Sequence, residues 1–327
     1  MLIILDDTAI QRRFSLILTL DITIMGRLRS SFISLILGVL LVSGTSFAQP
    51  DMDSWRMRLD TGAAHRWQTD IDDGGQVERD TLSMRLAVDK AVAPDLRLGL
   101  AAGYGERRYR FDGETGFGAL KPWSNIRELR LSGSLNWTVD ERWNLFAMPT
   151  IRWFAEEGAD LSDGQISGLI AAASYRVNDR LSLGPGFGLF SELEGEVDWF
   201  PILAIDWKLT DTLALRTGSG FAATEGPGLV LDWQPLEHWS LLLGARYEKA
   251  RFRLDDKGVA AGGVGQESAV PVYFGATRHF GRQLRLSLIA GVEFSGELRL
   301  EDADGRLIDK TRYDPAPFGI ATLGLRF

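Results

Sequence analysis

Apolar residues recur at every second position over long stretches of this sequence. In residues 239–248 the apolar side consists of Trp239, Leu241, Leu243, Ala245 and Tyr247. The same alternation runs through residues 128–137, 197–209 and 284–295. A period of two indicates β-strands, and a tilted strand that crosses a membrane needs about 9–11 residues. We therefore expect long strands with one lipid-facing side.

Short polar turns alternate with longer acidic loops between these strands. The short turns lie at residues 94–95, 140–142, 178–180, 210–212, 237–238 and 281–283. The longer loops lie at residues 70–75, 112–122, 156–164, 192–196, 223–226, 255–267 and 301–314. These connections indicate about 14 strands, an even number as in bacterial barrels. The sequence predicts an all-β, transmembrane, antiparallel up-and-down β-barrel, with twelve or sixteen strands as alternatives.

Tryptophan placement supports a membrane barrel over a large soluble β-sandwich. The tryptophans near short turns are Trp55, Trp137, Trp143, Trp207, Trp233 and Trp239, and those near long loops are Trp153 and Trp199. Aromatic residues at both membrane interfaces are typical of transmembrane barrels. In a sandwich, tryptophans would instead be core residues scattered along the strands.

The N-terminal segment has the pattern of an export signal. Arg27 and Arg29 precede an apolar run at residues 32–42, and Ser46 and Ala48 are the small residues of a cleavage site. We expect an upstream translated extension at residues 1–24, a cleaved signal peptide at residues 25–48 and an outer-membrane barrel at residues 49–327. Whether Met1 or Met25 is the start stays open.

Composition limits the partners more than the fold. The net charge of −8 argues against nucleic acid, and the absence of cysteine leaves no disulfide to stabilise the fold. A hydrophobic content of 45% suits a soluble domain and a barrel equally. Together with the export signal, the strand pattern predicts the bacterial outer membrane as the location, with its lipid and lipopolysaccharide as partners.

The chain ends on Phe327 after an alternating stretch at residues 321–327. A terminal aromatic residue on an amphipathic strand is similar to the C-terminal signature of bacterial outer-membrane barrels. That resemblance implies that Phe327 is an assembly signal, read by the barrel-assembly machinery.

Little in the sequence suggests catalysis or metal binding. His238 and His279 lie at short turns, and His65 lies on the outward side of the first strand. None is placed for a nucleophile–base pair. The acidic residues at 301–309 do not match a calcium-binding loop. We expect no enzyme activity, no catalytic residue, no cofactor and no metal.

The inward side of the strands carries many charged residues. The predicted pore-lining residues are Arg85, Arg130, Arg152, Arg216, Arg246, Asp206, Asp232, Glu248 and Glu293. Charges in a lumen require water or counter-charges, so we expect a passive channel for small polar or charged solutes, narrowed by the glycine-rich loop at residues 258–265. The alternative is a closed structural or surface-binding barrel that acts through its acidic extracellular loops.

The C-terminal half also resembles a family of bacterial outer-membrane β-barrels without an assigned function. The resemblance rests on residues 251–256, the loop at residues 262–265, residues 270–272, residues 296–302 and residues 313–318. It implies an outer-membrane barrel but supplies no substrate. In strand number and length the chain is similar to monomeric fourteen-stranded porins, which implies a monomer.

Overall fold

The computed structural model describes residues 55–195, 197–217 and 227–327. The expected extension at residues 1–24, the expected signal peptide at residues 25–48 and the whole of the predicted loop at residues 223–226 lie outside the described residues. Within the three described ranges, no helix is long and apolar enough to cross a membrane.

The described residues form strands with a few short helical turns. The strands are β1 (Arg56–Asp70), β2 (Gln76–Ala93), β3 (Leu96–Asp112), β4 (Asn125–Thr138), β5 (Trp143–Glu156), β6 (Gln165–Asn178), β7 (Leu181–Ser191), β8 (Val197–Lys208), β9 (Leu213–Thr217), β10 (Gly228–Leu236), β11 (Trp239–Arg246), β12 (Glu248–Arg253), β13 (Val264–Phe280), β14 (Leu284–Glu301), β15 (Leu307–Tyr313) and β16 (Ala316–Arg326). The helical turns are α3 (Gly116–Leu120), η2 (Leu161–Gly164) and η3 (Leu193–Gly195).

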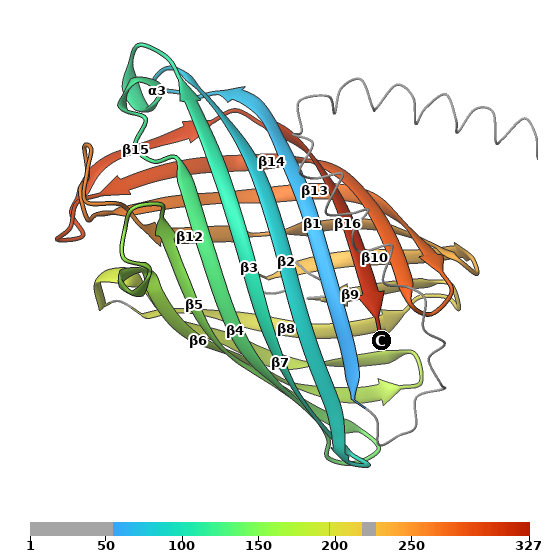
Figure 1. Ribbon diagram of the computed structural model, residues 1–327. Coiled ribbons are helices and arrows are strands. Elements are labelled where there is room, and N and C mark those ends of the chain that lie inside the picture. Colours follow the sequence, from blue (N-terminus) through green and yellow to red (C-terminus); the bar gives the residue numbers. More distant parts are fainter. Residues whose placement is uncertain (1–54, 196, 218–226) are drawn as a thin grey trace, which may run out of the picture. The chain divides into compact units, whose positions relative to one another are not determined.

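The strands close into an antiparallel barrel (Figure 1). β1 to β11 pair in sequence order, followed by β13, β14 and β16, and β16 pairs with β1. β12 extends β11 beyond Tyr247, and β15 leads into β16 across Asp314 and Pro315. The barrel therefore has 14 strands, and the predicted fold and strand number are confirmed.

Side-chain caps explain why the turns at one end are so short. The Asp140 carboxylate accepts hydrogen bonds from the backbone N–H groups of Arg142 and Trp143 at 2.7 and 2.8 Å. The side chains of Asn178 and Thr210 accept bonds from the second and third residues after them in the same way. Aspartate, asparagine and threonine favour such turns because their oxygens replace a backbone acceptor.

A belt of exposed apolar side chains surrounds the barrel. Leu100 is 68% exposed and Trp199 is 67% exposed. The other exposed tryptophans are Trp55, Trp67, Trp137, Trp143, Trp207 and Trp233. Soluble monomers rarely expose contiguous apolar surface on this scale, so the belt is the lipid-facing surface of a transmembrane barrel.

The two sides of the barrel differ in height. β2 and β14 have 18 residues each, whereas β7 and β8 have 11 and 12. At about 3.3 Å per residue, the longer strands extend roughly 20 Å further along their own direction. The loops expected at residues 255–267 and 301–314 are correspondingly shorter than predicted, because residues 264–267 belong to β13 and residues 307–313 form β15.

The upper end of the C-terminal half bends across the mouth of the barrel. β11 pairs with both β10 and β13, but β12 pairs with β13 and reaches β5 through Arg253 and Ala155. A register shift in β13 and the left-handed φ of 53° at Ser295 in β14 mark the same level. These breaks let β12 to β15 leave the line of the barrel wall.

Buried rings fill the enclosure that this bend creates. We call Tyr109, Phe111, Phe117, Trp123, Phe154 and Phe252 the aromatic plug. The Phe252 ring is fully buried, and its centroid lies 5.3 Å from that of Trp123 and 5.5 Å from that of Phe154. Ala260, from the glycine-rich loop expected to narrow the lumen, is buried in the same cluster. The plug therefore packs inside the barrel at the long-loop end.

Candidate functional site in the lumen

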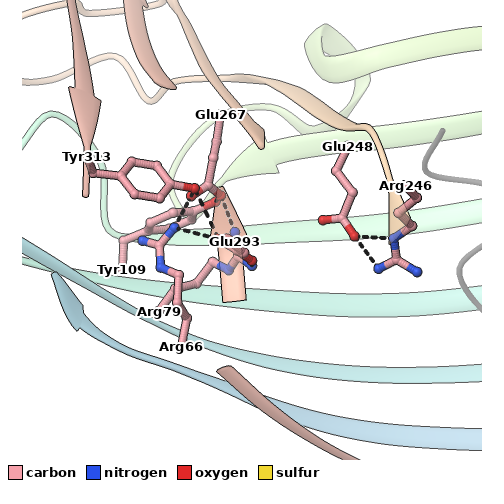
Figure 2. A network of polar contacts seen from close by, with 8 residues as sticks. All are labelled: Arg66, Arg79, Tyr109, Arg246, Glu248, Glu267, Glu293 and Tyr313. Atoms are coloured by element: carbon pink, nitrogen blue, oxygen red, sulfur yellow. Dashed lines mark hydrogen bonds and ion pairs between the residues drawn. The ribbon is translucent and has the colours of Figure 1, made fainter. Parts of the chain in front are cut away.

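A cluster of buried charges that Tyr109 of the aromatic plug contacts lies inside the barrel (Figure 2). Arg66 on β1 and Arg79 on β2 are direct cross-strand partners. Both bind Glu267 on β13 and Glu293 on β14; the Arg66–Glu293 and Arg79–Glu293 distances are 3.2 and 2.7 Å. Arg66 is 1% exposed and Glu267 is 4% exposed. Two cations and two carboxylates thus neutralise each other inside the barrel.

Two tyrosines complete the cluster. The Tyr109 hydroxyl donates to Glu267 at 2.7 Å, and the Tyr313 hydroxyl lies 3.0 Å from Glu293. Removing one partner of a buried ion pair leaves an uncompensated charge, which costs about 3–5 kcal/mol. The cluster therefore ties β1, β2 and β3 to β13, β14 and β15 at the level where the strands bend.

A chamber of about 150 Å³ lies inside the barrel beside this cluster. Its charged lining comprises Arg66, Arg79, Arg85, Arg107, Arg130, Arg246, Glu106, Glu128, Glu248 and Glu293. Its apolar lining includes Ala64, Pro271, Phe318 and Ile320. The lining thus combines charged and apolar side chains.

Most of the charges in the chamber have partners. The Arg130 Nε lies 2.9 Å from Glu128, and Arg246 binds Glu248 in the same way (Figure 2). Arg107 lies over the Phe154 ring, 5.1 Å from its centroid. Arg85 has no ion pair among the described residues; the charged groups that act on it are Asp60, Arg58 and Arg130.

The structure brings five of the predicted pore-lining residues into this chamber: Arg85, Arg130, Arg246, Glu248 and Glu293. Arg152 lies just beyond it, over the Phe154 ring and beside a smaller cavity that Glu248 also lines. That these residues line a conducting pore stays a prediction.

The other three predicted residues form a separate group on the neighbouring strands β8, β9 and β10. Arg216 binds Asp206 at 3.3 Å and Asp232 at 3.1 Å. The Asp206 side chain is 56% exposed, so this ion pair is accessible to solvent near the short-turn end of β8.

A second basic group lies at the short-turn end. Arg58, Arg285 and Arg326 surround a cavity of about 50 Å³, and Asp60 binds Arg285 at 2.7 Å. Together with Arg85 and Arg130, these residues form a series of arginines that runs from the short-turn end to the chamber.

Ion pairs fasten β12 to the shorter side of the barrel. Lys249 binds Asp198 at 2.8 Å, and Arg253 binds Glu194 at 2.7 Å. Arg251 binds Glu192 at 3.0 Å. Alternate residues of β12, Ala250 and Phe252, are buried in the cluster of the plug. One face of β12 is thus ion-paired and the other packs in the plug.

On the outer surface, His65, Glu78 and Asp80 bring three metal-ligand atoms within 4.8 Å of one another. His65 Nδ1 lies 2.7 Å from Asp80, and the Arg110 guanidinium binds both carboxylates. A cation would compete with Arg110 for these oxygens, so the arrangement fits an interfacial ion-pair network better than a metal site.

Phe327 lies at the barrel seam. Its backbone N–H donates to Met57 O at 3.0 Å, and Met57 N–H donates to Phe327 O at 3.2 Å. The terminal ring is exposed. Its recognition by the assembly machinery stays a prediction.

Sequence reasoning missed the plug and the buried cluster. Glu267 was expected in a loop, whereas it lies in β13 on the same face as Gly265. Residues 264–270 read Val-Gly-Gln-Glu-Ser-Ala-Val and do not alternate between apolar and polar positions, so no local signal placed Glu267 in a strand. No local pattern marks Trp123, which lies outside any strand.

The chain matches no protein-family model and no curated protein sequence. Among solved structures, an outer-membrane channel from Pseudomonas putida F1 is 9% identical, with a TM-score of 0.46, and the match covers 86% of this chain and 100% of that chain. A Pseudomonas aeruginosa FadL homologue is 12% identical, with a TM-score of 0.49 and coverages of 84% and 90%. The KdgM porin is 10% identical, with a TM-score of 0.34 and coverages of 82% and 99%. At these values the likeness supports no conclusion about what this chain does.

Proposed function

We propose that this protein is a channel of the bacterial outer membrane for small polar or charged solutes, with a preference for anions. The observation that carries the proposal is the series of arginines in the lumen: Arg58, Arg285 and Arg326 near the short turns, then Arg85 and Arg130 in the chamber. Rings of positive side chains attract anions into a pore. A purely structural network would be expected to give Arg85 a counter-charge, because a desolvated unpaired charge is costly.

The outer belt supports the membrane location. Its exposed leucines and tryptophans suit lipid rather than water. Outer-membrane lipid and lipopolysaccharide would surround the belt, and the barrel-assembly machinery would recognise Phe327. The barrel would act as a monomer.

Passage through the lumen requires the plug to open. The plug contains Phe252 on β12, a strand that leaves the wall at Tyr247. The upper part of β13 also pairs with β14, which pairs with β15. Because the wall is already interrupted at this level, β12 and the upper parts of β13 to β15 would move together, while β11 and the lower half of β13 keep their pairing. We propose that the described arrangement is the closed state of the channel.

The plug also favours a second candidate function, a closed barrel that acts through its surface loops. Phe117, Phe154 and Phe252 are fully buried. If this packing never opens, the inward charges serve only as a structural network. The acidic surface loops would then be the binding surface of the protein.

Single-channel recording distinguishes the two functions. Residues 49–327 would be refolded, their folding verified by heat-modifiable migration, and inserted into a planar bilayer under a salt gradient. We expect current steps with a reversal potential on the anion-selective side. Folded protein that stays silent at all voltages would contradict the channel and support the closed barrel.

A further inference from the structure

The chamber beside the buried cluster is lined by arginines and by apolar side chains. Arg85, Arg107 and Arg130 come from the adjacent strands β2, β3 and β4. Phe318 and Ile320 of β16 and Pro271 of β13 supply apolar surface beside them. A solute in this chamber meets guanidinium groups and hydrocarbon at the same time.

Charge in the chamber is not balanced. The Arg66–Arg79–Glu267–Glu293 cluster is neutral, as are the Arg130–Glu128 and Arg246–Glu248 pairs. Glu106 binds Arg108, which does not line the chamber. What remains is positive, and Arg85 is the cation without an ion pair among the described residues. An anion would supply the missing counter-charge.

The arginines of the lining also favour a carboxylate in particular. Arg85 on β2 and Arg130 on β4 both line the chamber. Guanidinium groups bind carboxylates with two parallel hydrogen bonds, which makes arginine suited to this anion.

The volume and the apolar lining residues guide the choice of anion. An apolar cavity of about 150 Å³ holds one benzene-sized molecule; the chamber has about that volume but is only partly enclosed, so the volume indicates the size of the body that fills it. A sugar acid would leave its hydroxyl groups unpaired against Phe318, Ile320 and Pro271, which is unfavourable. An inorganic anion would make no contact with the apolar lining residues Phe318, Ile320 and Pro271.

We infer that the chamber is a binding site for a small monocarboxylate with an apolar body about the size of a benzene ring. The carboxylate would lie against Arg85 and Arg130, and the apolar body against Phe318 and Ile320. This inference names the solute class of the proposed channel and rests on that function only in taking the lumen as the path of the solute.

Calorimetry with benzoate tests the site in the folded, detergent-solubilised barrel of residues 49–327. We expect benzoate to bind, and benzyl alcohol and acetate, which each lack one half of the ligand, to bind at least tenfold more weakly. Equal affinity for benzoate and benzyl alcohol, or no benzoate binding at millimolar concentration, would overturn the inference.

Two variants and a control locate the site. Arg85→Gln should weaken benzoate binding at least tenfold, and Ala64→Phe should abolish it by filling the chamber at unchanged charge. Arg176→Gln makes the same charge change on β6, outside the chamber lining, and should leave binding intact. Heat-modifiable migration verifies that each variant is folded. If Arg85→Gln binds like the unmodified protein, or Arg176→Gln weakens binding as much, the assignment to this chamber is wrong.

Binding in detergent does not require conduction, so the two proposals can fail separately. Benzoate binding with silent bilayers would refute the channel and leave the site. Current steps without benzoate binding would refute the site and leave the channel.

Discussion

Replacing Phe252 with alanine tests whether the aromatic plug is the gate. The Phe252 ring is fully buried and lies against three rings, those of Trp123, Phe154 and Tyr109, at centroid distances of 5.3, 5.5 and 6.3 Å. Truncating a buried phenylalanine to alanine costs about 3–5 kcal/mol. This free energy is lost from the closed arrangement only, because Phe252 no longer contacts these rings once β12 has moved away from the plug.

The expected effect on the gate follows from this energy. Each 1.4 kcal/mol corresponds to about a tenfold change in an equilibrium, so the ratio of closed to open barrel should fall by at least about 100-fold. Single-channel recording at fixed voltage measures this as open probability. We expect long openings in Phe252→Ala where the unmodified barrel is mostly closed.

A control on the next strand separates gating from general loss of stability. Phe274 on β13 is exposed on the lipid-facing surface, and Phe274→Ala should leave the open probability unchanged. If folded Phe252→Ala opens no more often than Phe274→Ala, the plug does not gate the lumen.

Three further predictions address the charges. Glu267→Gln removes the carboxylate that Arg66, Arg79 and Tyr109 share and should lower the free energy of unfolding by about 3–5 kcal/mol; an unchanged urea midpoint would contradict this. Arg130→Ala with Arg152→Ala should move the reversal potential toward cation preference, because both arginines flank the chamber; an unshifted potential would show that they do not face the ion path. The two backbone N–H groups that Asp140 accepts from lower the pKa of its carboxyl. Its stabilising effect is therefore present above the ordinary carboxyl range and lost as pH falls through the lowered pKa, so Asp140→Ser should flatten the acid limb of the unfolding profile; the same acid limb in both proteins would exclude this turn as its cause.

Local sequence patterns predicted the wall of the barrel well. Residues 284–295 alternate because one side meets lipid, and the short turn at Asp140 follows from a side chain that can cap it. The alternation and the turn cap each depend only on residues that are close in the sequence. Because both recur along the chain, counting them gives the number of strands.

The contents of the barrel are not a local property. β12 alternates between Lys249, Arg251 and Arg253 on one face and Ala250 and Phe252 on the other, as a wall strand would. This alternation shows that β12 has a charged face and an apolar face, but it does not show what each face contacts. In the structure the apolar face packs in the plug rather than against lipid. Glu267 and Arg66 lie far apart in the sequence and meet only after the barrel has closed. Such contacts across the lumen require the three-dimensional arrangement.

The seam between β1 and β16 has a consequence for how the barrel can form. Arg58 pairs with Arg326 and Met57 with Phe327, so the first described strand completes its pairing only with the end of the chain. Until that end has arrived, both edges of the growing sheet carry unpaired backbone groups, which are prone to pair with other chains. Joining the two ends also closes the longest loop in the molecule, with the largest entropic cost. The seam should therefore be the last contact to form, and a chain cut short before β16 would remain an open sheet with two adhesive edges.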